Sequence, residues 1–130
     1  MTARTKFELE YILKTSPKVL ENMLFTPSGL SEWFADDVNV YGDLYTFVWE
    51  DSEQQARHCP IDKHKRQIRF QWIEDEEEGN DFYFEIGYSI DAMTKDVILK
   101  ITDFAETNEV EDSCMLWEQQ VVELRRTLGC

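Results

Sequence analysis

Apolar and charged residues alternate near the start of the chain. The apolar positions of this stretch are Phe7, Leu9, Tyr11 and Leu13, and charged residues separate the first three of them. Because successive side chains of a strand point to opposite faces, this alternation predicts a half-buried first strand.

Two pairs of residues next in the chain have the character of helix starts. Ser16-Pro17 and Thr26-Pro27 each place an N-cap residue directly before a proline that fits the first helical turn. Apolar residues at helical spacing follow the first pair, so we expect a short helix that ends near Phe25. The second pair predicts another short helix immediately afterwards.

The second short helix has a distinctive end. Leu30, Trp33 and Phe34 fall at i, i+3 and i+4, on one face of the helix. The acidic pair Asp36-Asp37 follows at once, which favours a turn through solvent. The helix is therefore expected to dock its C-terminal end, with both aromatic rings, into a core.

From Val38 onward the pattern changes to alternation with a period of two. It predicts six strands, over residues 38–42, 44–50, 53–60, 66–74, 81–90 and 96–104. The acidic run Glu74 to Gly79 is interpreted as a solvated hairpin loop. Connections this short indicate an antiparallel meander.

One face of these strands is rich in aromatic and aliphatic residues, and the alternate face is polar. The residues of the apolar face are Tyr45, Phe47, Trp49, Ile68, Phe70, Trp72, Phe82, Phe84, Ile86, Tyr88, Val97, Leu99 and Ile101. A sheet with one solvated face must cover the other. The cover is expected to be a final long helix, whose apolar stripe is Cys114, Trp117, Val121, Leu124 and Leu128.

A strand, two short helices, six strands and a long final helix follow the order of the helix-grip fold, an α+β architecture. The segments TPSGLSEWFADDV, YTFVWE, FYFEIGYSIDAMTKDVILKITDF and LWEQQVVELRRTLG resemble the START-like or SRPBCC superfamily. They are most similar to small stand-alone bacterial START-like proteins, and more distantly to the branch of the heat-shock-protein ATPase activator. The resemblance implies a curved sheet that grips the last helix, usually around an apolar cavity, and it implies no single activity.

Composition narrows the classes of partner. A chain of 130 residues with 42% hydrophobic residues is expected to fold as one domain, residues 1–130. Its 27 acidic against 13 basic residues give a net charge of −14, which repels nucleic acids and anionic membranes. The one basic run, Lys63 to Arg66, is interpreted as a solvated turn.

The cysteines and the N-terminus indicate where the protein works. Cys59, Cys114 and Cys130 form no CxxC pair and leave an odd thiol, which does not suit a disulfide framework. The chain shows neither a signal-peptide pattern at its start nor an apolar stretch of membrane-spanning length, so a cytoplasmic protein without membrane insertion is expected.

Candidate chemistry is sparse. His58, Cys59 and His64 could bring soft ligands near one turn, but adjacent strand residues face opposite sides, so no metal site is predicted. Cys59 could be a thiol nucleophile with Arg57 and His58 nearby in sequence, and a small half-buried strand residue explains it equally well. The acidic run lacks the alternating ligand spacing of a calcium loop.

Asp103 is the acidic residue with two open interpretations. Alternation from Val97 places it on the aromatic face, where a buried carboxylate would have a perturbed pKa. The favoured interpretation is instead that the strand ends at Thr102 and that Asp103 opens a turn. No catalytic residue, metal or cofactor is predicted.

The best prediction of function is therefore a binding module for a small hydrophobic ligand. We expect a cavity lined by Trp33, Phe47, Trp49, Phe70, Trp72, Phe82, Phe84, Leu99, Trp117 and Val121. The alternative is a protein-interaction or chaperone-linked co-regulator, with the acidic surface steering a basic protein partner. A cyclase-type enzyme, which would use the shape of a cavity, ranks third.

Overall fold

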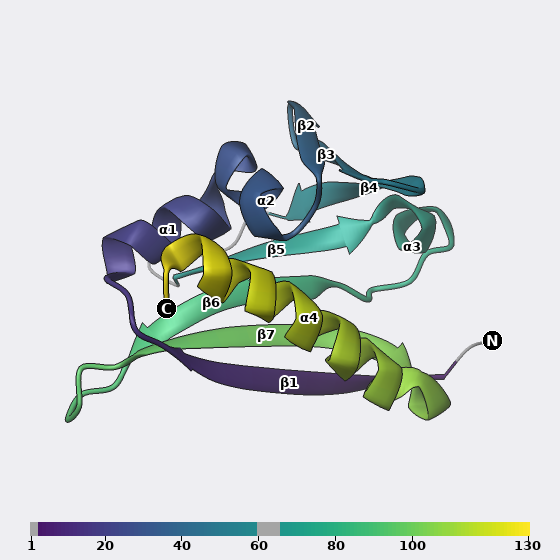
Figure 1. Ribbon diagram of the computed structural model, residues 1–130. Coiled ribbons are helices and arrows are strands. Elements are labelled where there is room, and N and C mark those ends of the chain that lie inside the picture. Colours follow the sequence, from purple (N-terminus) through teal and green to yellow (C-terminus); the bar gives the residue numbers. More distant parts are fainter. Residues whose placement is uncertain (1–2, 60–65) are drawn as a thin grey trace.

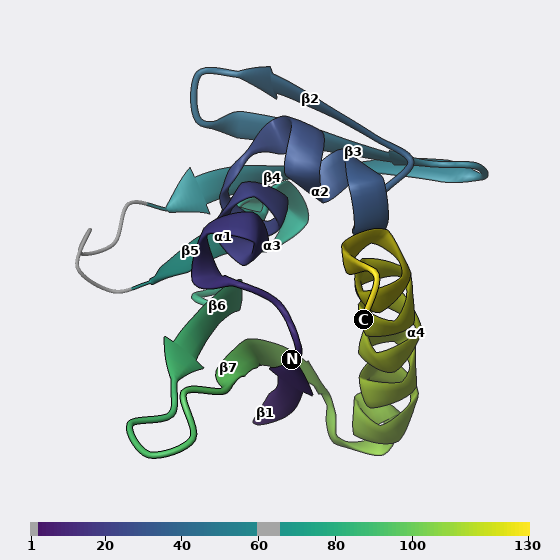
Figure 2. The same ribbon diagram turned by 60° about the vertical axis from the view of Figure 1, so that its left-hand side comes forward.

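A strongly curved antiparallel sheet wraps around the helices of the protein (Figures 1 and 2). The structure is a computed structural model that describes residues 3–59 and 66–130. Its strands are β1 (Arg4–Leu13), β2 (Asp37–Tyr41), β3 (Leu44–Trp49), β4 (Ser52–Cys59), β5 (Gln67–Trp72), β6 (Phe84–Ile90) and β7 (Val97–Glu106). The α-helices are α1 (Pro17–Phe25), α2 (Pro27–Trp33), α3 (Ile73–Glu77) and α4 (Val110–Leu128), and a short 3-10 helix covers Thr107–Glu109.

The seven strands form one sheet in the order β1-β7-β6-β5-β4-β3-β2. The predicted six-strand meander is thus confirmed, and the first strand closes the sheet by pairing with the last one. In that pairing Leu13 lies opposite Val97 and Arg4 lies opposite Glu106. This crossover places β1 beside β7 at one edge of the sheet and leaves β2 at the other edge.

The concave face of the sheet is covered by three helices. Helix α4 lies over β1 and β7 and against α2, while α1 lies over β5. The sequence predicted that one long helix would provide the cover, and the structure shows that α1 and α2 share this role. The arrangement is the predicted helix-grip fold, with Trp117, Val121 and Leu124 as the buried stripe of α4.

The starts of the short helices confirm the predicted caps. Ser16 Oγ accepts a hydrogen bond from the Val19 amide, and Thr26 Oγ1 accepts one from the Gly29 amide at 2.9 Å. At Gly29 the two helices approach so closely that an added Cβ would lie 1.8 Å from the carbonyl oxygen of Asn22. A glycine is therefore needed where α2 turns back against α1.

The core is built from interlocked rings. Phe47, Phe70 and Phe84 are at most 1% exposed. The ring centroids of Phe47 and Phe70 lie 5.4 Å apart, and those of Phe70 and Phe84 lie 5.2 Å apart. Such spacings are those of favourable aromatic pairs. The prediction that the apolar strand face forms the interior is confirmed at these positions.

The structure differs from the prediction at three places that bear on the candidate residues. The acidic run is not a solvated loop, because residues Ile73–Glu77 form α3 and Asp75 is only 4% exposed. Strand β5 ends at Trp72 and β6 begins at Phe84, so Phe82 lies outside the strand to which it was assigned. Strand β7 continues to Glu106, and the predicted turn at Asp103 is therefore wrong.

No helix in residues 3–59 and 66–130 is both long and apolar enough to cross a membrane. The basic run predicted as a turn, Lys63 to Arg66, lies outside the described residues except for Arg66.

Candidate functional site

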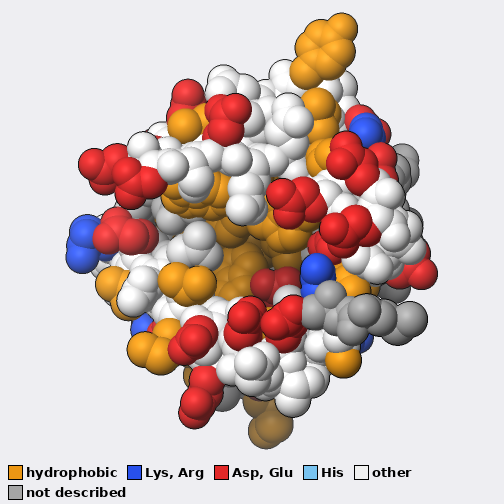
Figure 3. All heavy atoms as spheres, turned by 90° about the vertical axis from the view of Figure 1, so that its right-hand side faces the viewer, with side chains coloured by type: hydrophobic (Ala, Val, Ile, Leu, Met, Phe, Trp, Pro, Cys, Tyr) orange, Lys and Arg blue, Asp and Glu red, His pale blue; other side chains and the backbone are white. Residues whose placement is uncertain are grey.

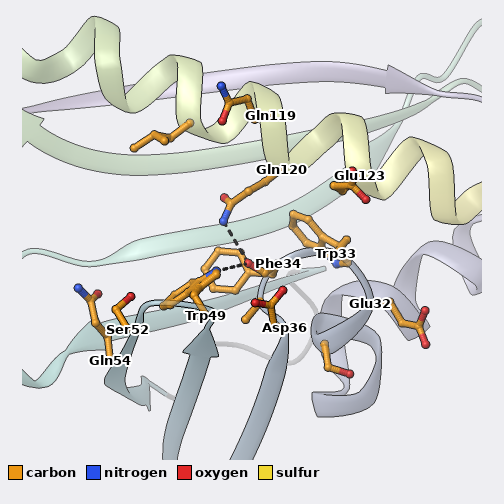
Figure 4. Close-up of a pocket in the computed structure, with 13 residues that line it drawn as sticks. Glu32, Trp33, Phe34, Asp36, Trp49, Ser52, Gln54, Gln119, Gln120 and Glu123 are labelled. Carbon is orange, nitrogen blue, oxygen red and sulfur yellow. Dashed lines mark hydrogen bonds between the residues drawn. The ribbon is translucent and has the colours of Figure 1, made fainter.

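A cleft opens between α2, the hairpin of β3 and β4, and α4 (Figure 4). Its volume is about 740 Å³. Residues from all three parts line it, namely Ser31, Glu32, Trp33, Phe34, Ala35, Asp36, Trp49, Ser52, Gln54, Leu116, Gln119, Gln120 and Glu123. The cleft therefore joins segments that are far apart in the sequence.

Phe34, which follows α2, forms the floor of the cleft. Its ring is 4% exposed and lies 5.0 Å from the ring of Phe47 and 5.7 Å from that of Trp117, centroid to centroid. Trp49 lies 5.8 Å away from it in an edge-on arrangement. Because Phe34 contacts rings from the sheet and from α4 together, the expected docking of the end of α2 into the core is confirmed.

The main-chain carbonyl of Phe34 holds the walls of the cleft in place. It accepts hydrogen bonds from Trp49 Nε1 at 3.0 Å and from Gln120 Nε2 at 3.1 Å (Figure 4). A carbonyl oxygen has two lone pairs, so both donors can be satisfied at once. These two bonds tie β3 and α4 to the end of α2.

A second pocket lies beyond the β3–β4 hairpin and shares Gln54 with the cleft. Its volume is about 490 Å³, and its lining includes Trp72, Arg4 and Asp75. Arg4 and Asp75 form a bidentate pair, with nitrogen–oxygen distances of 3.0 Å in both contacts. Figure 3 looks at this end of the molecule and shows a hollow with hydrophobic side chains at its floor and acidic ones around it.

The residues predicted to line a cavity do not share one pocket. Trp33 and Trp49 meet in the cleft, and Trp72 lines the second pocket. Phe82 is half-buried, and the Arg4 guanidinium lies over it with its Cζ atom 4.4 Å from the centroid of the Phe82 ring. The others, Phe47, Phe70, Phe84, Leu99, Trp117 and Val121, are at most 6% exposed and belong to the core. Their role in ligand binding stays a prediction.

Asp103 lies on the aromatic face, as the less favoured interpretation had it. Trp117 Nε1 donates to its Oδ2 at 2.9 Å, and the Phe104 amide donates to its Oδ1 at 2.7 Å. Burial raises the pKa of Asp103 to about 6, although both hydrogen bonds act in the opposite direction. The strand continues through Asp103 because its partner β1 extends opposite it, with Phe7 at the paired position.

The described residues contain no group of three or more His, Cys, Asp or Glu side chains that could hold a metal. Cys59 ends β4 as a half-buried residue, and burial raises the pKa of its thiol, which disfavours the reactive thiolate. His64 lies outside the described residues.

The sequence interpretation missed several residues of the cleft. Phe34 was placed in the core but not at a site, and Asp36, Leu116 and Gln120 were not considered as lining residues. Leu116 carried little signal in the sequence, because single exposed apolar residues are common on protein surfaces. No pattern in the sequence marked Gln120, because its role depends on the carbonyl of Phe34, which is distant in sequence.

Comparison with known proteins gives one family and several structural neighbours. The profile of the START-like superfamily domain matches residues 1–130. The Bacteroides fragilis protein BfR322 is 41% identical in sequence to this chain. Its solution NMR structure matches with a TM-score of 0.65, over 98% of this chain and 92% of that chain. No curated protein matches the chain.

Two further neighbours share the fold alone. The Aha1 dimer from Colwellia psychrerythraea is 16% identical, with a TM-score of 0.74 over 95% of this chain and 96% of that chain. The protein XoxI from Bacillus cereus is 10% identical, with a TM-score of 0.71 over 97% of this chain and 95% of that chain. Because the family profile spans all of the described elements, the protein belongs to the START-like superfamily.

Proposed function

We propose that the protein binds a small hydrophobic molecule in the cleft between α2, the β3–β4 hairpin and α4. The observation that carries this proposal is a concave site of about 740 Å³ with an aromatic floor. Small-molecule sites typically occupy roughly 300 to 1,000 Å³ and combine apolar walls with a few polar groups. Membership of the START-like superfamily supports the proposal, since hydrophobic ligands are common among its domains.

The packing of the interior favours the cleft over a central cavity. Phe47, Phe70 and Leu99 are not measurably exposed, and the two phenyl rings are packed against other rings. A tightly packed interior leaves little space for a ligand without rearrangement. Trp49, in contrast, is half-buried and presents part of its indole to the cleft.

Native mass spectrometry of freshly purified protein tests the proposal directly. A bound molecule adds mass under gentle conditions and is released by solvent extraction. Titration with hydrophobic compounds should also change the fluorescence of Trp33 and Trp49, because both indoles line the cleft. A protein without bound mass, together with flat titrations, would contradict ligand binding.

We predict that Leu116→Gln weakens ligand binding about tenfold. Leu116 is 62% exposed in the free protein and lines the cleft, so a ligand would cover it. Losing that apolar contact costs on the order of 1.5 kcal/mol. The dissociation constant, measured by fluorescence titration, checks this prediction.

Met115→Gln is the matched control. Met115 is the preceding residue of α4 and is 57% exposed, but it does not line the cleft. We expect this variant to keep the affinity of the unmodified protein. Equal losses in the two variants would show that the cleft is not the binding site.

A second candidate is a protein-interaction module with a basic partner. Met115, Leu116 and Val122 are at least 50% exposed on α4, which is unusual for a helix whose other residues are mainly polar. The net charge of −14 would speed encounter with a positively charged protein. This candidate predicts that Met115→Gln and Val122→Gln reduce partner binding, whereas a cleft ligand would be insensitive to both.

A further inference from the structure

Four hydrogen-bond donors of the cleft are already used within the protein. Trp33 Nε1 donates to the Met23 carbonyl at 2.9 Å, and Trp49 Nε1 donates to the Phe34 carbonyl at 3.0 Å. Gln120 Nε2 also donates to the Phe34 carbonyl, and Ser31 Oγ donates to the Ser28 carbonyl at 2.7 Å. These groups have their partners, so they are poorly placed to bind an anionic or acceptor group of a ligand.

The acceptors of the cleft are in the opposite situation. Glu32 and Asp36 are exposed carboxylates at its rim, and neither forms an ion pair within residues 3–59 and 66–130. Glu123 lines the same cleft and is paired with Arg126. Among the described residues that line the cleft, none is a Lys, Arg or His. Its charged side chains are therefore all carboxylates, beside the neutral polar side chains of Ser52, Gln54 and Gln119.

The aromatic residues strengthen this preference. The faces of indole and phenyl rings carry negative charge density and attract cations, Trp most strongly. Trp49 is half-buried in the same cleft as Asp36, and Figure 4 shows the carboxylate of Asp36 next to the residues of the floor. The net charge of −14 adds a field that concentrates cations at concave sites.

From these observations we infer that the cleft takes a small hydrophobic molecule with a positive charge, such as an alkyl or aryl ammonium ion, and discriminates against fatty acids. The inference rests on the proposed ligand-binding function and adds the chemical class of the ligand. The apolar part lies on Phe34, Trp49 and Leu116. The cationic group lies toward Asp36, to which it can donate a hydrogen bond, and Glu32 adds negative charge at the rim.

A fatty acid fits the same apolar floor but not the rim. Its carboxylate would lie near Glu32 and Asp36, with no basic side chain among the described lining residues to balance it. Like charges repel each other, and no cationic side chain among the described lining residues offsets the cost of desolvating the carboxylate. The two ligand classes are thus separated by the sign of their charge and not by their apolar part.

The test uses three probes with the same hydrocarbon chain: decylammonium, decanol and decanoate. Their dissociation constants are measured by isothermal titration calorimetry and tryptophan fluorescence at neutral pH, in low and in physiological salt. We expect decylammonium to bind at least about tenfold more tightly than decanol, and decanoate to bind most weakly. Added salt should reduce the advantage of the ammonium ion, because salt screens exposed charges.

The double variant Glu32→Gln, Asp36→Asn removes the rim carboxylates while keeping similar shapes. It should reduce the preference for decylammonium over decanol to less than about threefold. The matched control, Glu111→Gln with Asp112→Asn, alters the net charge equally at exposed positions of α4 outside the cleft. It should keep the preference. Circular dichroism checks that both proteins fold.

Each outcome separates the two proposals. If none of the probes binds and no molecule is extracted, both the ligand-binding function and its ligand class are wrong. If decanol and decanoate bind as tightly as decylammonium, the binding function stands and the cationic preference is overturned. If the control variant lost the preference for decylammonium equally, the preference would result from general surface charge, and the inference would be overturned. The inference would also be overturned if decylammonium did not bind while a lysine-rich peptide bound in a way that depended on the rim carboxylates.

Discussion

A single carboxyl group, that of Asp103, connects the sheet to the last helix. It accepts the indole N–H of Trp117 and so links β7 to the buried stripe of α4. Burial is the largest influence on this group, which is why the pKa of Asp103 rises to about 6 despite two hydrogen bonds. The charge of Arg4 favours the ionised form but does not offset the effect of burial.

This raised pKa predicts a pH-dependent contribution to stability. In the unfolded chain an aspartate titrates near about pH 4, so between about pH 4 and 6 the folded protein holds a proton that the unfolded chain has released. The free energy of unfolding therefore falls as the pH rises through this window. The contribution of Asp103 is at most about 2 to 3 kcal/mol.

Asp103→Asn isolates this contribution. The amide oxygen can still accept from Trp117, but the side chain no longer titrates. The difference in unfolding free energy between the variant and the unmodified protein, from urea unfolding across this pH range, should change in favour of the variant as the pH rises. A difference that is independent of pH would show that Asp103 titrates normally.

At the scale of elements, the short helix α3 shows how one ion pair fixes local structure. Asp75 is buried, and both of its carboxylate oxygens bind the Arg4 guanidinium from the start of β1. The backbone N–H of Asn80 also donates to the Asp75 carbonyl at 2.9 Å. These contacts hold an acidic run as a helix against the sheet, although its remaining carboxylates are exposed.

We predict that Asp75→Ala lowers the free energy of unfolding by about 2 to 4 kcal/mol. The variant leaves a partly buried guanidinium without its partner, and breaking such pairs is costly. Glu123→Ala is the control, since its pair with Arg126 is exposed and contributes less than about 1 kcal/mol. Chemical denaturation of both variants measures the contrast. Similar losses in the two would mean that the Arg4–Asp75 pair is solvated.

At the scale of the whole molecule, the net charge is −14, and most Lys and Arg side chains in residues 3–59 and 66–130 pair with a carboxylate. Arg4, Arg57 and Arg69 are each bound to carboxylates within the described residues. Such paired bases offer little positive potential to a polyanion. The surface as a whole therefore favours cationic partners, in agreement with the chemistry of the cleft.

We accordingly predict no measurable binding to DNA or RNA at physiological salt. A protein that binds nucleic acid without sequence preference needs several free Lys or Arg side chains that neutralise phosphates. Fluorescence anisotropy of labelled duplex and single-stranded oligonucleotides at micromolar protein checks this. An anisotropy increase that disappears with added salt would contradict it and would direct attention to the run Lys63 to Arg66.

The sequence by itself determined the order of the strands and of α1, α2 and α4, but not α3 or the 3-10 helix. Alternation of apolar and polar residues located every strand, because the sheet is apolar on one face and solvated on the other. The N-caps Ser16 and Thr26 and the spacing of Leu30, Trp33 and Phe34 located the short helices, since these signals act within a few residues. Part of the candidate site, Trp33 and Trp49, was predicted for the same reason.

The tertiary structure alone decided the features that depend on partners distant in sequence. Asp75 is buried because Arg4, separated from it by 71 positions, reaches it across the sheet. Asp103 continues its strand because β1 extends opposite it. The hydrogen bond from Trp117 then lowers the energetic cost of burying its carboxyl group. The cleft exists because Gln120 and Trp49 meet at one carbonyl, that of Phe34. Local patterns carry no information on which distant groups meet, because that depends on how the sheet curves around its helices.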